Sequence, residues 1–155
     1  MSIIEAMNEE IKAKNEVWEF VKFAVIALLV VLPIRMWIAQ PFIVHGSSMV
    51  PTFESGDYLI IDEITYQFRG PERGEVIVFR YPQNPSQFFI KRVAGLPGET
   101  INGTKLPQNE YYVLGDNTFA SSDSRYWGPV KSNLIIGRAV LRLWPVSSLG
   151  ILTSI

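Results

Sequence analysis

The hydrophobic pattern of this sequence changes its period near Pro41. Residues 17–38, VWEFVKFAVIALLVVLPIRMWI, form a nearly continuous apolar run, which is typical of a helix that is buried or lies in a membrane. After Pro41, short runs of β-branched and aromatic residues alternate with turn residues, which indicates strands. The two patterns predict a mainly β fold: one domain, residues 40–155, that follows an N-terminal helix.

Five strands are predicted in the second part of the chain, each bounded by turn residues. The most specific turn signal is Asn102-Gly103, because both residues tolerate the positive φ angles of a two-residue hairpin. The predicted strands are Tyr58–Ile61, Glu75–Tyr81, Gln87–Val93, Tyr111–Leu114 and Ile135–Trp144.

The apolar run is predicted to be a transmembrane anchor at residues 17–39, preceded by a cytoplasmic segment at residues 1–16. Its charge-free centre, Phe23–Ile34, is shorter than the roughly 20 residues that a span needs, so length alone favours a buried helix. Lys22 and Arg35 flank this centre, however, and can extend their charged ends to the two interfaces. A removable signal peptide is the alternative, but no small-x-small cleavage site follows the run.

The positive charges around the anchor predict its orientation. Lys12, Lys14 and Lys22 lie on its N-terminal side, whereas the next basic residue after Arg35 is Arg69. This asymmetry predicts a cytoplasmic N-terminus and a domain outside, in contact with the lipid bilayer. No transit-type segment rich in Arg and Ser is present, which favours a bacterial cytoplasmic membrane.

Composition excludes several classes of function. The chain has no cysteine and one histidine, which excludes a thiol nucleophile and disfavours a metal site. From residue 40 onward, ten Lys and Arg residues are matched by ten Asp and Glu residues. A neutral domain lacks the cationic surface that nucleic-acid binding requires.

A serine-rich turn, Gly46–Phe53, is the candidate for chemistry, although such a turn is often only structural. A serine hydroxyl needs a neighbouring base. In an extended chain His45 would point to the face opposite Ser48, so a structural role is favoured for it. Lys91 lies in an apolar strand between Phe89 and Val93, where burial would lower its pKa; the alternative is an edge lysine whose head reaches water. A Ser48/Lys91 dyad is the pair that the residues readily allow.

Four motifs in this order resemble those of type I signal peptidases, the membrane-anchored Ser/Lys proteases of peptidase family S26, in their minimal single-anchor bacterial form. The motifs are Ser48–Thr52, Arg73–Phe79, Ile90–Glu99, and Gly115–Asn117 with Ser121–Gly128. The resemblance implies a signal-peptidase-like β-fold and an endopeptidase that removes signal peptides from preproteins after small-x-small sites, without cofactor or metal.

The resemblance also implies the role of each site residue. Ser48 is the nucleophile and Lys91 the general base; Ser121 holds the lysine by a hydrogen bond, and Asp123 and Arg125 form a supporting ion pair. The implied substrate-binding residues are all apolar: Val44, Met49, Phe53, Leu59, Phe89 and Ile90.

The sequence departs from the family pattern at two places. Gly46 stands where many members have a serine that helps to bind the oxyanion, which leaves the Ser48 N–H as the donor. Thr118-Phe119-Ala120 replaces residues that are usually polar.

Three alternative functions are weighed against signal-peptide removal. They are a self-cleaving repressor, which would need DNA-binding helices and a basic surface; a family member with a narrow substrate range; and a non-enzymatic membrane-anchored β module.

Overall fold

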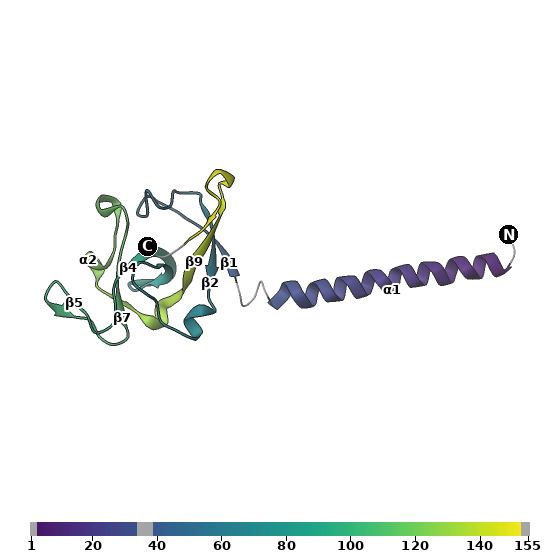
Figure 1. The fold of residues 1–155 in the computed structure, drawn as a ribbon, viewed down its shortest axis with the longest axis horizontal. Helices are drawn as coiled ribbons and strands as arrows, with labels where there is room; N and C mark the ends of the chain where they lie inside the picture. Colours follow the sequence, from purple (N-terminus) through teal and green to yellow (C-terminus); the bar gives the residue numbers. More distant parts are fainter. Residues whose placement is uncertain (1–2, 34–38, 153–155) are drawn as a thin grey trace. The chain divides into compact units, whose positions relative to one another are not determined.

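A computed structural model describes residues 3–33 and 39–152 of the chain (Figure 1). The chain divides into two compact units, residues 1–37 and 38–155. The first contains the helix α1 (Ile3–Pro33), and the second contains all the described strands, so the predicted mainly β fold is confirmed. The strands are β1 (Ala39–Ile43), β2 (Tyr58–Asp62), β3 (Val76–Tyr81), β4 (Asn84–Gly95), β5 (Thr100–Ile101), β6 (Thr104–Lys105), β7 (Glu110–Leu114), β8 (Val130–Lys131), β9 (Ile135–Trp144) and β10 (Gly150–Ile151). Short helices between them are η2 (Thr65–Gln67), η3 (Thr118–Ala120), α2 (Ser124–Trp127), η4 (Ser132–Leu134) and η5 (Val146–Ser148).

The transmembrane helix predicted for residues 17–39 is not supported. Within residues 3–33 and 39–152, no helix is both long enough and apolar enough to cross a membrane. Glu19 and Lys22 interrupt the apolar run of α1 with charge and form an ion pair of 2.8 Å on its surface. Residues 34–38 lie outside the described part, and Ala39, predicted as the end of the anchor, begins β1 instead.

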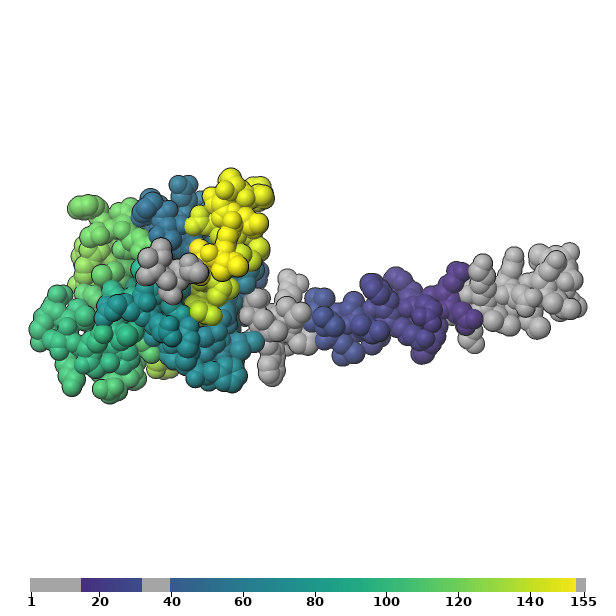
Figure 2. All heavy atoms as spheres, in the orientation of Figure 1, coloured from purple at the N-terminus to yellow at the C-terminus, as the bar shows by residue number. Residues whose placement is uncertain are grey.

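The main sheet is antiparallel, in the order β1-β2-β9-β3-β4-β7-β8, and β10 pairs with β9. In Figure 2 the yellow C-terminal residues of this unit lie beside its blue N-terminal residues, in agreement with the pairing of β2 with β9. β5 and β6 form the separate hairpin that Asn102-Gly103 predicts, with φ angles of 50° and 78° at the two turn residues. All five predicted strands are present, and the structure adds β1, β8 and β10.

The central strand β3 is buried on both faces of the sheet. Val76 and Val78 belong to one hydrophobic cluster, and Ile77 and Phe79 belong to the other. Successive strand residues point to opposite faces, so the sheet has a core on each side. Burial on both faces explains why this strand reads as a continuous apolar run rather than an alternating one.

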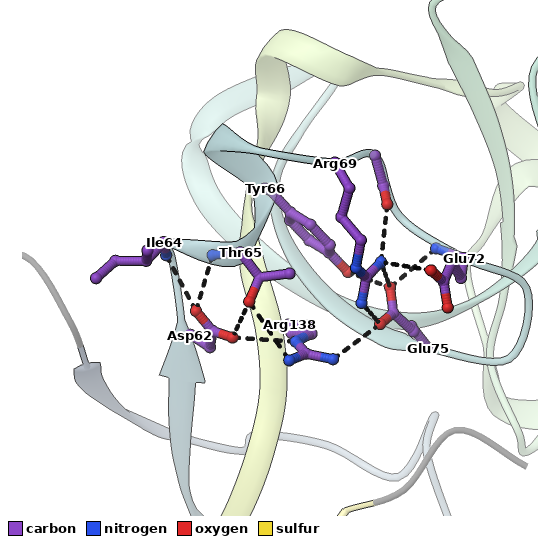
Figure 3. A network of polar contacts seen from close by, with 9 residues as sticks. Asp62, Ile64, Thr65, Tyr66, Arg69, Glu72, Glu75 and Arg138 are labelled. Atoms are coloured by element: carbon purple, nitrogen blue, oxygen red, sulfur yellow. Dashed lines mark hydrogen bonds and ion pairs between the residues drawn. The ribbon is translucent and has the colours of Figure 1, made fainter.

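A partly buried ionic network joins β2, β9 and Glu75, the residue before β3 (Figure 3). Arg138 bridges Asp62 and Glu75, with N–O distances of 3.1 Å to each carboxylate. Glu75, which is 5% exposed, also accepts hydrogen bonds from Arg69 (2.5 Å) and the Tyr66 hydroxyl (2.9 Å). Burial by itself raises the pKa of Glu75, but the hydrogen bonds to its carboxylate together have the larger, opposite effect. The pKa of Glu75 is therefore below its usual range. The ionised Glu75 is thus paired in the interior, as a buried charge must be.

Candidate active site

Two buried side chains hold the serine turn in place. Met49 and Phe53 are fully buried in the core cluster that also contains Val44 and Leu59. The Phe53 N–H donates to the Met49 carbonyl at 2.8 Å, which closes the turn. Ser48, the residue before Met49, is left half-buried at the surface of this core.

The structure brings Ser48 and Lys91 together, although 43 residues separate them in the sequence. Lys91 Nζ donates a hydrogen bond to Ser48 Oγ at 2.7 Å, and a second one to the Ile90 carbonyl at 2.9 Å. Lys91 is 4% exposed and lies on the face of β4 that contains Phe89 and Val93, as the period of the strand predicts. The amine is therefore oriented toward the hydroxyl and shielded from water.

Burial lowers the pKa of Lys91 to about 8, against the opposing attraction of Asp123 and Asp116. Desolvation disfavours the charged ammonium, which explains the direction of the shift. A lysine with this pKa is neutral in a substantial fraction of molecules near pH 7–8 and can accept a proton there.

Asp123 organises the loop beside Lys91. It is fully buried and accepts hydrogen bonds from the Gly115 N–H (3.0 Å) and the Ser121 hydroxyl (2.7 Å), and it forms an ion pair with Arg125 (2.8 Å). Burial raises the pKa of Asp123, but Arg125 and the other donors lower it to about 2. Within residues 3–33 and 39–152 no hydrogen bond joins Ser121 to Lys91; the Ser121 hydroxyl donates to Asp123 instead.

Arg92 and Asp116 form a second clamp, to which the sequence analysis assigned no role. The Arg92 guanidinium makes two hydrogen bonds to the Asp116 carboxylate, at 2.8 and 2.7 Å, and also donates to Thr52 Oγ1 at 3.3 Å. The next residue, Asn117, donates its backbone N–H to the Ser48 carbonyl at 2.9 Å. Both residues lie in motifs that the sequence already pointed to: Arg92 adjoins Lys91, and Asp116 lies within Gly115–Asn117.

A cavity of about 550 Å³ opens beside Ser48 and Lys91. Of the residues predicted to bind substrate, Val44, Leu59, Phe89 and Ile90 line it. Met49 and Phe53 do not, because both side chains are buried in the core beneath the turn. The lining residues that the sequence analysis missed are Phe42, Ile43, Ser47, Val78, Gln87, Phe88, Ala120 and Ser122.

His45 and Gly46 occupy the rim of the same cavity. His45 is exposed there, and in the described ranges no group of three or more His, Cys, Asp or Glu residues could hold a metal ion. Gly46 has a φ of +86°, a conformation that residues with a Cβ rarely adopt. The backbone at this position therefore favours glycine over a residue with a side chain, such as the serine that the family resemblance led us to expect. The Ser48 N–H has no hydrogen-bond acceptor in the described part of the chain.

A serine hydroxyl beside a buried lysine, at the edge of an apolar cavity, is the arrangement required by serine hydrolases that use lysine as the base. The family model for signal peptidase, peptidase S26, matches residues 17–105 and 99–144. This chain belongs to that family and is a peptidase, which confirms the predicted resemblance.

Named relatives agree with this assignment. A signal peptidase I from Leptolyngbya laminosa is 38% identical over 173 residues, covering 90% of this chain and 85% of that protein. A probable signal peptidase I-2 from Synechocystis sp. is 36% identical over 178 residues, covering 94% and 82%. The mitochondrial ATP-independent inner membrane protease subunit 1a of Arabidopsis thaliana is 34% identical over 120 residues, covering 69% and 71%. A crystal structure of a signal peptidase I from Enterococcus faecalis shares 25% identity at a TM-score of 0.40, over 45% of this chain and 97% of that chain.

Proposed function

We propose that this protein removes signal peptides from preproteins by cutting after small-x-small sequences, with Ser48 as nucleophile and Lys91 as general base. The observation that carries the proposal is the 2.7 Å contact between Lys91 Nζ and Ser48 Oγ beside the apolar cavity. Family membership supports the substrate class, because relatives across the length of the chain are named signal peptidase I.

In the proposed reaction, neutral Lys91 accepts the Ser48 proton while Oγ attacks the scissile carbonyl carbon. The tetrahedral intermediate collapses as the lysine ammonium protonates the departing amine, which leaves an acyl-enzyme on Ser48. Water then attacks the ester, Lys91 takes a proton from it, and the peptide acid leaves as Oγ is reprotonated. The Ser48 N–H is available as a donor to the oxyanion in both steps.

The cavity is suited to an extended peptide. β1 is an edge strand of the described sheet, and β4 pairs with β7 only from Arg92 onward, so the part of β4 before Lys91 has one open edge. Residues of both β1 and β4 line the cavity. An extended substrate can add to these edges through its backbone, while small side chains fit against Val44, Leu59 and Ile90.

A preprotein with alanine at the first and third positions before the cut tests this function. We expect cleavage directly after the alanine at the first position before the cut, identified by N-terminal sequencing of the product. Tryptophan at the first position should lower kcat/KM by at least about 10²-fold, because a bulky side chain clashes with the apolar wall, whereas tryptophan at the second position should have little effect. Absence of cleavage, or equal rates for all three substrates, would contradict the proposal.

We propose that the whole apolar run of residues 17–38, of which residues 17–33 belong to the described part of α1, attaches the protein to a bacterial cytoplasmic membrane in a single pass, with the peptidase unit outside. Large apolar side chains of α1 are exposed, among them Phe20 (72%), Phe23 (70%) and Leu29 (69%), which favours burial against lipid. Relatives named inner membrane proteases support a membrane setting. Protease added to intact spheroplasts is expected to degrade the peptidase unit; protection until lysis would contradict this orientation.

A narrow substrate range is the second candidate, because some relatives bear the name of mitochondrial inner membrane protease subunits rather than signal peptidase I. The broad and the narrow substrate range can be distinguished with a panel of preproteins. All members have alanine at the first and third positions before the cut, but they differ in their apolar segments. Cleavage of most members supports the broader function, and cleavage of one or two supports the narrower one.

A further inference from the structure

Aromatic side chains form the apolar surroundings of Lys91. Lys91 Nζ lies 5.4 Å from the centroid of the Phe89 ring, two residues away on β4. Tyr81 on β3 stacks against Phe89, with centroids 4.4 Å apart and an interplanar angle of 12°, and its hydroxyl donates to Gln83. Phe79, paired with Phe89 in the strand register, meets it edge-on at 6.4 Å. The Phe89 ring is thus held from two sides next to the amine.

Trp127 completes this aromatic cluster from α2. Its ring centroid lies 5.9 Å from that of Phe79 and 5.7 Å from that of Tyr81, the latter in a T-shaped arrangement. The indole Nε1 is buried and has no hydrogen-bond partner among the described residues. Buried indole N–H groups usually have one, and leaving it unpaired costs free energy. The ring at this position therefore contributes through packing rather than through a polar contact.

We propose that Trp127 is a positioning residue for the base: by packing on Tyr81 and Phe79 it fixes Phe89 against Lys91, which keeps water from Nζ and keeps Nζ directed at Ser48. This inference rests on the proposed function, since it concerns the base of that reaction. The segment Ser121–Gly128 then acts on the lysine in two ways, by charge through Asp123 and by apolar packing through Trp127.

These two influences on Lys91 oppose each other. Burial lowers its pKa, whereas Asp123 and Asp116 raise it. Both carboxylates are paired with arginines, Asp123 with Arg125 and Asp116 with Arg92. Loosening the aromatic cluster admits water to Nζ and leaves the carboxylates in place, so the pKa of Lys91 should rise.

The pH dependence of kcat/KM for the full chain in detergent tests this role. In Trp127→Leu, we expect the apparent pKa of the base to rise by about one unit. Since pH 7 lies below both values, the neutral fraction, and with it kcat/KM at pH 7, falls about tenfold, while the plateau at high pH changes little. Trp127→Phe keeps an aromatic ring and should nearly restore the wild-type profile. Leu134→Ala is the control: it removes a side chain from the same core cluster outside the ring contacts, and should lower Tm without moving the profile.

Direct NMR titration of Lys91, with labelled lysine in a Ser48→Ala background, requires no substrate. A raised Lys91 pKa in Trp127→Leu supports the inference even if no preprotein is cleaved, in which case only the proposed function fails. Tyr81→Leu is also expected to raise the pKa of Lys91, and this variant replaces Trp127→Leu in the experiment if Trp127→Leu does not fold. An unchanged Lys91 pKa in these variants overturns the inference, whether or not cleavage occurs.

Discussion

Replacing Ser48 by alanine is expected to lower kcat for preprotein cleavage by about 10⁴-fold or more, and Lys91→Met should do the same. In the proposed reaction Ser48 provides the attacking oxygen, and Lys91, whose Nζ lies 2.7 Å from Ser48 Oγ, takes its proton. Because the two residues act as one unit, the double variant should be no slower than either single variant. The measurement is single-turnover cleavage of a preprotein in detergent.

Matched controls make this result specific. Ser47→Ala removes the neighbouring hydroxyl of the same turn, and Lys105→Met removes an exposed lysine of β6; both should retain activity within about tenfold. A penem, which acylates reactive serines, should label the wild type but not Ser48→Ala. Retained turnover in Ser48→Ala or Lys91→Met rejects the dyad, and absence of labelling in the wild type favours a turn serine that is only structural.

The proposed dyad also predicts how the activity of the wild-type enzyme depends on pH. The pKa of Lys91 is lowered to about 8, and only the neutral amine accepts a proton. Below that value kcat/KM should fall about tenfold for each pH unit, and above it the rate should level off. A flat profile between pH 6 and 9 would contradict the assignment of Lys91 as the base.

Gly115→Ala is expected to have the second large effect, with kcat lower by about 10²-fold or more and the free energy of unfolding lower by about 1–3 kcal/mol. A Cβ at this position would lie 2.5 Å from the Ser121 Cβ and 2.6 Å from the Ser48 carbonyl oxygen, and would also contact the Ser121 hydroxyl. Backbone and side chain must therefore move, and the movement displaces the nucleophile and the loop that contains Asp123.

The matched control for this substitution is Gly150→Ala, since no atom lies within 4 Å of a Cβ at Gly150. Neither activity nor Tm should change there. The measurements are steady-state kinetics and thermal unfolding of the two variants side by side. A Gly115→Ala protein with wild-type kcat would show that the Ser48 carbonyl and the loop around Ser121 need not be fixed for catalysis.

Several parts of the fold and the site could be read from the chain because they depend on neighbouring residues. The period of β4 places Lys91 with Phe89 and Val93, and Asn102-Gly103 specifies its hairpin by φ angles alone. The strand β1 could not be read in this way, because Pro41 and the end of the apolar run hide it in the sequence. Its residues become a strand through pairing with β2, from Ala39 opposite Asp62 to Ile43 opposite Tyr58.

The sequence by itself determined the kinds of groups available: a serine turn, a lysine in an apolar strand, no cysteine and a single histidine. Only the tertiary structure decided which of them meet. The burial of Met49 and Phe53 fixes the turn and directs these two side chains away from the cavity, and the packing of the core places Lys91 of β4 2.7 Å from Ser48. The tertiary structure also decided the partner of Ser121: its hydroxyl donates a hydrogen bond to Asp123, because a buried carboxylate must be satisfied by nearby donors. Contacts between residues far apart in the chain depend on the packing of the whole core, which local patterns do not encode.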